Sequence, residues 1–565
     1  MSHSRRLTYG AAQDFGVRRP DAALLVFRVI RVYRVIRGSF YFQHKNDPRI
    51  TRNNANKFIT NHSSHFTAFH LHSPRKYILL FTVHFSTDFM PNRREFIGSA
   101  VAATVLPKIN FSQTRRRPNI LFILADDLGY GDLSCYGRPD YQTPNLDRLA
   151  TQGVRFVNAY SASPLCTPTR CAFITGRYPA RTRVGLEEPI HEKRSLGEQA
   201  LTIGLPREHP TVASLLKGSG YETALIGKWH LGYLPNFSPI KSGFDEFYGI
   251  MSGAADFFTH KDMQGDLDFY EGEVPVEHIG YMTDLLTRRA VEYISRRRGN
   301  RGDRPFYLSL HYTAPHWPWE GPHDRPPDPE LRGPVAFRAG GSLKKYAEMM
   351  KSLDDGIGQV LNALSRAGRA RGTIVVFTSD NGGERFSYHW PFTGEKGALW
   401  EGGIRVPAIL RWPGVVPAGR ISQQPLITMD WTATLIAAGK AQADPAYPLD
   451  GIDLLNTGTA GVSPALSAKR EQSALRPLTS DISHLTSRTF FWRHSNQSAV
   501  LKGPWKYLHD GTNEYLFNLE VDQRERANFR TQNPAMFEQL KKDFAAWEST
   551  VLPRPPARIQ RSSGL

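Results

Sequence analysis

Short, nearly continuous hydrophobic runs alternate with longer amphipathic runs between residues 118 and 440. The run Asn119–Ala125 lies between a proline and two aspartates, and its hydrophobic character is typical of a strand buried on both faces of a parallel sheet. Further strands are predicted at residues 154–160, 223–227, 306–312, 373–379 and 404–412. Helices are predicted at residues 143–150, 211–217, 281–297, 343–364 and 427–438. This alternation predicts an α/β fold, with a large mixed and mostly parallel sheet between two layers of helices.

The pattern changes after residue 455. Residues 456–485 are rich in Ser, Thr, Ala and Gly, and we interpret them as a junction. Four short runs and a final amphipathic run follow, at residues 489–492, 498–501, 505–508, 515–519 and 534–547. They predict a small antiparallel sheet with a terminal helix. Because 565 residues are enough for two domains, we expect a large domain at residues 117–457 and a smaller C-terminal α+β domain at residues 458–565.

The first 117 residues differ in charge from the rest of the chain. They hold 20 lysines and arginines against five aspartates and glutamates, and so carry +15 of the formal charge of +18. The remaining body is nearly neutral and has no concentrated basic stripe, which disfavours nucleic-acid binding. No stretch reaches the roughly 18–20 uninterrupted apolar residues that a membrane-spanning helix needs.

Residues 1–89 are basic and show no sustained hydrophobic period. Four histidines lie close together in this segment: His62, His65, His70 and His72. A metal site there is conceivable, but no Cys, Asp or Glu joins them, so a solvated or disordered segment is the favoured interpretation.

Met90 is followed by Arg93-Arg94 and by a short run of small apolar residues ending at Pro107. This order resembles a twin-arginine export signal, with a chance Arg-Arg pair as the alternative. We therefore predict that residues 90–116 are a signal segment and that the mature protein is periplasmic or secreted. On this interpretation Met90 is the true start, and residues 1–89 are a non-native extension.

Polar residues collect where the predicted strands end. The clusters are Asp126-Asp127, Cys166 with Arg170, Lys228 with His230, His316, and Asp380-Asn381. In open α/β sheets, ligands bind outside the carboxyl ends of the strands. We therefore expect these five clusters to converge on one rim of the sheet and to form a functional site.

Two kinds of side chain make up this set. The all-oxygen group suits a hard cation such as Ca²⁺ or Mg²⁺ rather than zinc, and its members are Asp126, Asp127, Asp380 and Asn381. The second group would bind an anion with several oxygens, and its members are Arg170, Lys228, His230 and Lys396. A metal and several cations facing one nucleophile suit hydrolysis of a sulfate or phosphate ester, because negative charge develops on the leaving oxygen.

The candidate nucleophile lies in the stretch Cys166-Thr-Pro-Thr-Arg170. Pro168 fixes φ and has no amide hydrogen, so we expect a rigid turn and a helix that begins at Arg170. A thiol and a guanidinium would then lie together at a helix N-terminus, which attracts anions. Three cysteines are too few for a disulfide framework, although one bridge stays open.

These residues lie in a series of motifs along the chain. The motifs are Cys166-Thr-Pro-Thr-Arg170, Pro118-Asn-Ile-Leu with Asp126-Asp127, Gly227-Lys-Trp-His-Leu-Gly232, Ala314-Pro-His316, Ser379-Asp-Asn-Gly-Gly383, Thr393-Gly-Glu-Lys-Gly397 and Glu401-Gly-Gly-Ile-Arg405. In identity and order they resemble the formylglycine-dependent sulfatases of the alkaline phosphatase superfamily, arylsulfatase type. The likeness extends from about residue 117 to about residue 530.

The resemblance implies a sulfuric ester hydrolase. A formylglycine-generating enzyme would oxidise Cys166 after translation and before folding. One hydroxyl of the hydrated aldehyde would attack sulfur, and the other, once deprotonated, would expel sulfate. Ca²⁺, in preference to Mg²⁺, would lie beside residue 166, bound by Asp126, Asp127, Asp380 and Asn381. An oxygen nucleophile suits a hard metal better than a soft thiolate does.

The resemblance also assigns roles to the remaining site residues. Arg170 and Lys228 would steady the hydrate and the sulfate, and Lys396 would bind the sulfate oxygens. His316 would protonate the leaving alcohol, since imidazole titrates near the working pH. His230 would accept the proton that triggers sulfate release.

Two rival functions stay open. A phosphonate or phosphate monoester hydrolase of the same superfamily could use a similar site, and a non-catalytic glycan-binding relative would keep Cys166 unmodified. Aromatic residues beside the motifs suit sugar faces, aryl rings or a core alike: Trp317, Trp319, Tyr388, His389, Trp390 and Trp400. A sulfated polysaccharide or oligosaccharide is the preferred substrate, with an aryl sulfate as the simpler alternative.

Overall fold

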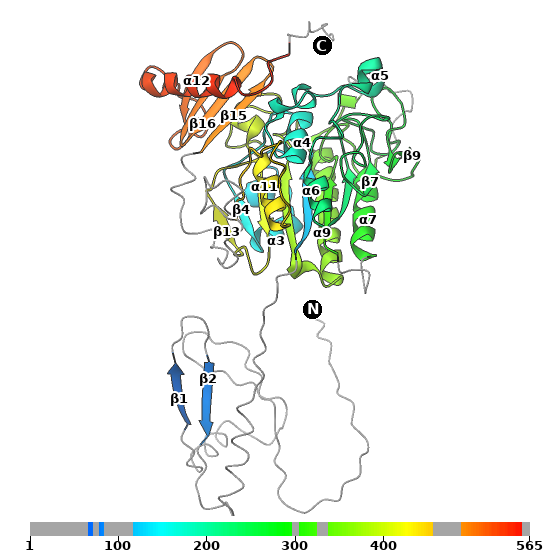
Figure 1. Ribbon diagram of the computed structural model, residues 1–565, viewed down its shortest axis with the longest axis vertical. Helices are drawn as coiled ribbons and strands as arrows, with labels where there is room; N and C mark the ends of the chain where they lie inside the picture. The colour runs from blue at the N-terminus through cyan, green and yellow to red at the C-terminus, as the bar shows by residue number, and fades with distance from the viewer. Residues whose placement is uncertain are drawn as a thin grey trace, which may run out of the picture. The chain divides into compact units, whose positions relative to one another are not determined.

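The computed structural model describes residues 66–71, 78–83, 117–296, 304–324, 337–455 and 488–555 (Figure 1). The chain divides into two units, Met1–Ser112 and Gln113–Leu565. In the first unit, β1 (Phe66–Leu71) and β2 (Ile78–Val83) pair in antiparallel register. The rest of residues 1–89 and the predicted signal segment at residues 90–116 lie outside the described residues.

The second unit is built on a ten-stranded sheet with the order β13-β4-β12-β11-β3-β10-β6-β7-β8-β9. Its central strands run parallel: β11 (Thr373–Ser379), β3 (Asn119–Ala125), β10 (Phe306–His311), β6 (Glu222–Gly227) and β7 (Glu246–Gly249). The outer strands are β4 (Val154–Phe156), β8 (Tyr270–Glu271), β9 (Val274–Pro275), β12 (Ala408–Arg411) and β13 (Arg420–Ser422). Because β8, β9 and β12 pair antiparallel, the sheet is mixed, and the predicted fold class is confirmed.

Alternate residues of β3 face two different helical layers. Leu121 and Ile123 belong to a core that they share with α3 (Pro144–Thr151), α7 (Met282–Ser295) and α9 (Leu343–Arg366). Phe122 packs on the other side, with α4 (Cys166–Thr175), α6 (Val212–Gly218) and α11 (Thr428–Ala438). Its ring stacks on Phe173 of α4 with 3.8 Å between centroids. A strand enclosed in this way has no solvent-facing side, which explains its continuous hydrophobic sequence.

Shorter elements connect these layers. They are the helices α5 (Lys193–Leu196) and α10 (Glu401–Ile404), and 3₁₀ turns at Ser134–Tyr136, Pro179–Arg181, Val184–Leu186, Gly197–Leu201 and Ala370–Gly372. Among the described residues, no helix combines the length and the apolar character that crossing a membrane requires. The three cysteines are free thiols, so the single disulfide that the sequence left open does not form.

The C-terminal region forms a separate four-stranded antiparallel sheet (Figure 1). Its elements are β15 (Thr489–His494), β16 (Gln497–Lys502), β17 (Trp505–His509), β18 (Glu514–Asn518) and the terminal helix α12 (Pro534–Glu548). The core of this sheet also includes Tyr160, Ala172 and Met429 from the large α/β body. The two parts therefore share one hydrophobic core. The expected boundary between residues 457 and 458 falls outside the described residues.

Two predicted strands differ from the structure. The run 154–160 is divided between β4 in the large sheet and β5 (Ala159–Tyr160), which pairs with β14 (Leu426–Ile427) in a sheet of its own. The run 404–412 begins as the last residue of α10, and β12 starts only at Ala408. Pro407 precedes that strand and has no amide hydrogen to donate to a ladder, which explains the late start.

A fully buried ion-pair network joins the C-terminal sheet to the large body. Lys506 of β17 lies 2.8 Å from Glu401 Oε1 and 2.7 Å from Glu525 Oε1. Arg405 Nη2 pairs with Glu401 Oε2 at 2.6 Å, and the Tyr160 hydroxyl donates to the same oxygen at 3.0 Å. Burial alone would raise the pKa of Glu401, but Lys506 and Arg405 outweigh it and hold the value at about 2. The carboxylate charge is therefore retained at the interface.

We expect Lys506→Met to reduce the free energy of unfolding by about 3–5 kcal/mol, because it leaves buried carboxylates without their ammonium partner. Urea unfolding monitored by tryptophan fluorescence would measure the loss. The matched control is Lys541→Met, which removes a surface pair with Glu514 and should cost less than about 1 kcal/mol. Equal effects of the two variants would contradict a special role for the buried network.

Candidate active site

The first turn of α4 positions Cys166 at the rim of the large sheet. The expected rigid turn before the helix is wrong, because α4 already begins at Cys166 and contains Pro168. The first four amides of a helix have no intrahelical acceptor, so a proline in that turn costs no hydrogen bond. Cys166 and Arg170 therefore lie one turn apart on the same helix, and both are buried.

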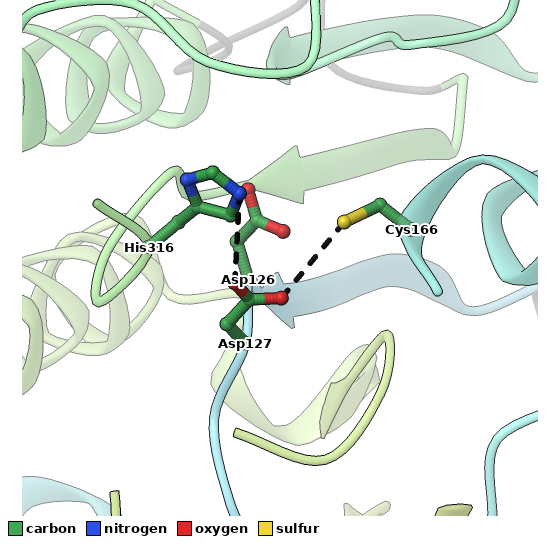
Figure 2. A group of neighbouring side chains, drawn as sticks. All are labelled: Asp126, Asp127, Cys166 and His316. Atoms are coloured by element: carbon green, nitrogen blue, oxygen red, sulfur yellow. Dashed lines mark hydrogen bonds and ion pairs between the residues drawn. The ribbon is translucent and has the colours of Figure 1, made fainter. Parts of the chain in front are cut away.

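Asp127 is the centre of the polar network at this rim. The Cys166 thiol donates to its Oδ1 at 3.8 Å, and Asn381 Nδ2 donates to the same oxygen at 2.7 Å. Its Oδ2 accepts from Lys396 Nζ at 2.6 Å and lies 3.5 Å from His316 Nε2. Figure 2 shows the thiol and the imidazole reaching different oxygens of Asp127. Asp127 has a φ of 60°, a backbone conformation that needs support from its surroundings.

Arg170 and Lys228 bind the other two carboxylates. Arg170 donates from Nε and Nη2 to Asp380 Oδ2 at 3.0 and 2.8 Å, and its Nη2 lies 3.2 Å from Asp126 Oδ1. Lys228 Nζ donates to Asp126 Oδ2 at 2.6 Å. The opposite oxygen of Asp380 accepts the Asp127 amide at 3.1 Å. The sequence predicted that the cations bind an anion and that the acids bind a metal. In the structure these two groups of side chains form one network.

The carboxylates of this network are not equally stabilised. Burial raises the pKa of Asp126, but Lys228 and Arg170 outweigh it and hold the value well below its usual range. Burial raises the pKa of Asp127 to about 7, against the opposing effect of Lys396. Burial and the neighbouring Asp126 raise the pKa of Asp380 to about 6. The site therefore has spare capacity for positive charge.

A compact group of possible metal ligands lies in the same place. One ligand atom from each member lies within 4.8 Å of the others, and the members are Asp126, Asp127, Cys166 and His316 (Figure 2). Asn381 Oδ1 is buried and has no hydrogen-bond partner, and the buried Asp126 Oδ1 has the Arg170 ion pair at 3.2 Å but no hydrogen bond. Asp380 reaches this group through Arg170 and the Asp127 amide. The expected metal ligands are thus brought together, with His316 beside them.

The two histidines are held in different ways. His230 has a φ of 58°, and its Nε2 lies 3.0 Å from the carbonyl oxygen of Ile190. Gly253 lies against the ring, since a Cβ there would come within 2.6 Å of His230 Cε1. His316 Nδ1 lies 2.6 Å from the carbonyl oxygen of Trp317. Burial, with Lys228 near His230 and Lys396 near His316, lowers both pKa values well below the usual range, so both rings are neutral.

A cavity of about 630 Å³ opens onto these groups. The predicted site residues among its lining are Cys166, His230, His316 and Lys396. Arg170 and Lys228 lie beneath it and do not line it. Of the candidate aromatic residues, Trp317 lines the cavity, whereas Trp400 packs on the rings of Tyr515 and Phe517 and belongs to the C-terminal core.

Sequence reasoning missed several residues of this site. Glu384 follows the Asp380-Asn-Gly-Gly motif directly and lies 3.1 Å from Lys396 Nζ. His311 is buried at the end of β10, with Nδ1 3.1 Å from the Lys228 carbonyl oxygen. A histidine inside an otherwise hydrophobic strand could have drawn attention to it. Arg338 and Arg385 also line the cavity, and no local pattern distinguishes them from other surface arginines.

Comparison with known proteins gives a consistent family assignment. The sulfatase family model matches residues 118–441. The chain is 34% identical over 356 residues to N-acetylgalactosamine-6-sulfatase of Sus scrofa, a match that covers 60% of this chain and 65% of that protein. It is 30% identical over 491 residues to arylsulfatase J of Mus musculus, covering 79% of this chain and 78% of that protein.

Solved structures agree. Ps i-CgsB in complex with k-i-k-neocarrahexaose superposes with a TM-score of 0.63 and 29% identity, covering 76% of this chain and 92% of that chain. The phosphonate monoester hydrolase of Agrobacterium radiobacter has a TM-score of 0.51 at 18% identity, covering 77% and 96%, which shows a common fold. Since the family model spans more than half of the 565 residues and includes the whole rim described above, the chain belongs to the sulfatase family of the alkaline phosphatase superfamily.

Proposed function

We propose that this protein hydrolyses sulfate esters, of a sulfated glycan or an aryl sulfate, with residue 166 as the nucleophile after its oxidation to formylglycine. One observation carries the proposal. Residue 166 lies at a helix N-terminus, 3.8 Å from Asp127, within a buried network of acids and cations at the base of a cavity. Export through the signal segment at residues 90–116, to the periplasm or beyond, is part of the same proposal.

The unmodified thiol is poorly suited to the reaction. Burial raises the pKa of Cys166 well above its ordinary value, despite the nearby Lys228 and Lys396, so the sulfur stays protonated at neutral pH. A protonated thiol is a weak nucleophile. Formylglycine would instead supply a hydrated aldehyde, whose hydroxyl is an oxygen nucleophile.

The donor set fits a hard cation, which we propose to be Ca²⁺. Its ligands would be Asp126, Asp127, Asp380 and Asn381, with residue 166 beside them. A cation at this place would provide a partner for the two buried oxygens that lack a hydrogen bond. It would also stabilise the ionised form of the two carboxyl groups with raised pKa values. The bound ion would supply positive charge next to the sulfate oxygens.

The chain's own residues divide the remaining work. Lys396 lines the cavity and would hold the sulfate oxygens, while Glu384 keeps its ammonium in place at 3.1 Å. Arg170 and Lys228 are fully buried, so we assign them to orienting Asp126 and Asp380 and to supporting residue 166 electrostatically. The resemblance implied that they steady the hydrate and the sulfate, and we propose that they do so indirectly, through these carboxylates.

The two histidines would move protons. His316 lines the cavity and would give a proton from Nε2 to the leaving oxygen. Because burial lowers its pKa, the protonated form needs an anion nearby, and a sulfate ester in the cavity is one. His230 is neutral, its Nδ1 has no hydrogen-bond partner, and it would accept the proton that accompanies sulfate release.

The central test compares the wild-type chain, produced together with a formylglycine-generating enzyme, with Cys166→Ser. We expect the variant to lose at least about 10³-fold in turnover of nitrophenyl sulfate, because the hydrated aldehyde is absent. Cys135→Ser is the matched control and should keep full activity. Mass spectrometry of the peptide around residue 166 would show the conversion.

Other outcomes of this experiment separate the rivals. Faster release of nitrophenol from the phosphate than from the sulfate would favour a phosphate or phosphonate monoester hydrolase. A wild-type protein whose residue 166 stays a cysteine despite the co-produced enzyme, and which turns over neither ester, would favour the glycan-binding relative.

Removal of metal should lower the stability of the protein. After chelation, adding Ca²⁺ at about 100 times its Kd should restore about 2.7 kcal/mol, seen as a rise in Tm. Asn381→Ala should lose most of this shift, whereas Asp543→Asn, on the terminal helix α12, should keep it. A larger shift with Mg²⁺ would overturn the choice of ion, and an unchanged shift in Asn381→Ala would overturn the ligand set.

The cavity wall favours a charged saccharide substrate. Arg338 lies over the ring of Trp317 at 4.9 Å, and Arg385 lies over the ring of Phe386 at 4.7 Å. Aromatic faces suit sugar rings, and guanidinium groups suit further sulfates or carboxylates. The names of the pig relative and of the Ps i-CgsB complex also point to saccharides.

We therefore expect Arg385→Ala to raise KM for a sulfated oligosaccharide at least about tenfold, and by a larger factor than for nitrophenyl sulfate. Steady-state kinetics on both substrates would measure the ratio. Arg420→Ala, an exposed arginine on β13, is the control. Equal changes on both substrates would show that Arg385 does not recognise the saccharide.

A further inference from the structure

We propose that the turn joining β15 to β16 in the C-terminal sheet positions the active site, and that Gln497 is the residue that places Lys396. Gln497 does not line the cavity and contacts no reacting group. It would act through the loop formed by residues 396–399. The proposal rests on the function proposed above for Lys396, that of binding the sulfate group.

Gln497 holds this loop with both ends of its amide. Its Oε1 accepts from the Leu399 amide at 3.0 Å, and its Nε2 donates to the Gly397 carbonyl oxygen at 2.9 Å. A side chain that donates and accepts within three residues fixes both the place and the orientation of that backbone. Gly397 has a φ of 85°, which only glycine adopts readily, so the loop has a specific backbone shape to preserve.

The same loop is tied to the reacting groups on its other side. The Gly397 amide donates to the Pro164 carbonyl oxygen at 3.0 Å, two residues before Cys166. The Lys396 amide donates to the Gly383 carbonyl oxygen at 3.0 Å, next to Glu384. The Lys396 side chain is only 8% exposed and ends on Asp127 and Glu384. A shift of residues 397–399 therefore moves the ammonium relative to residue 166 directly.

The turn also contacts a second segment that leads into the cavity lining, at residues 188–190. His494 Nδ1 lies 3.1 Å from Glu188 Oε2, and the Ser495 amide donates to the same oxygen at 2.8 Å. Glu188 precedes Pro189 and Ile190, which line the cavity. The Ile190 carbonyl oxygen is the partner of His230 Nε2 at 3.0 Å. Three residues of this turn, His494, Ser495 and Gln497, thus support two segments that line one cavity.

Docking of the C-terminal sheet does not depend on Gln497. The sheet is held by the buried Lys506 network and by a core that contains Phe490 and Trp492. Gln497 is partly exposed and belongs to neither. Removing its two hydrogen bonds should therefore move the loop without separating the two parts of the protein.

The test uses Gln497→Met, which keeps the length of the side chain and removes both hydrogen bonds. In a Cys166→Ala background, calorimetric titration with inorganic sulfate should show at least about tenfold weaker binding than with Gln497 present. In the enzyme with residue 166 converted, KM for nitrophenyl sulfate should rise by a similar factor, with a smaller change in kcat. Gln497→Glu keeps an acceptor for the Leu399 amide but sets a carboxylate oxygen against the Gly397 carbonyl oxygen, so it should weaken sulfate binding at least as much as Gln497→Met.

Lys502→Met is the matched control. Lys502 is on the same strand but pairs with Asp543 of α12 at 2.8 Å, away from the loop. It should leave sulfate affinity unchanged. Any of three results would overturn the proposal. These are equal losses of sulfate affinity in the two Met variants, unchanged sulfate binding in Gln497→Met, and no sulfate binding in the Cys166→Ala protein itself.

Unfolding of both Gln497 variants, seen by circular dichroism, would overturn it too, since the residue would then be needed for folding. Failure of the proposed function is a separate result. It would appear as a converted wild-type protein that releases no nitrophenol from the sulfate, while the sulfate titration would still decide the role of Gln497.

Discussion

The interaction on which this molecule depends is the mutual neutralisation of charges buried at the rim of the large sheet. The acids are Asp126, Asp127 and Asp380, and the cations are Arg170, Lys228 and Lys396. Taking a single charge of this kind out of water costs several kcal/mol, so each member is tolerated only because the others are in place. The pairing also explains why these charges come from the ends of three strands, one helix and the loop that carries Lys396. Each of them carries a charge that a neighbour needs. Burial raises the pKa values of Asp127 and Asp380, so a further positive charge beside residue 166 would stabilise these two carboxylates.

The C-terminal sheet extends the same principle to a second place. Lys506, Glu401, Arg405 and Glu525 are buried where the two parts meet, and Glu401 begins the short helix α10 that follows the Lys396 loop. The segment from residue 393 to 405 therefore has one end in the active site and the other in the interface. The position of the C-terminal sheet and the shape of the active site are therefore coupled, because the backbone between Lys396 and Glu401 is too short to absorb a displacement of either end.

Local pattern was sufficient where burial alone decides the structure. The strands β3 and β11 have the predicted bounds because a strand enclosed on both faces must be hydrophobic throughout. Local pattern was insufficient where partners that are distant in sequence determine the structure. The run 154–160 is broken because its two halves pair with strands in different sheets. Arg170 binds Asp380, 210 residues away, and Gln497 reaches Gly397, 100 residues away, and neither pairing leaves a periodic signal. The start of α4 was misplaced because proline is a helix breaker in general but not in the first turn.

The burial of residue 166 constrains the order of events in maturation. Its side chain is 2% exposed, lies within the first turn of a helix, and is enclosed by a charge network whose members come from four other elements of the fold. Under the proposed function a maturation enzyme has to reach this cysteine, and in the folded chain that would require unwinding α4 and separating Arg170 from Asp380. Leaving those buried charges unpaired costs several kcal/mol. The proposed function therefore implies that conversion to formylglycine precedes folding, so that the nucleophile is already made when the charges at the rim are buried.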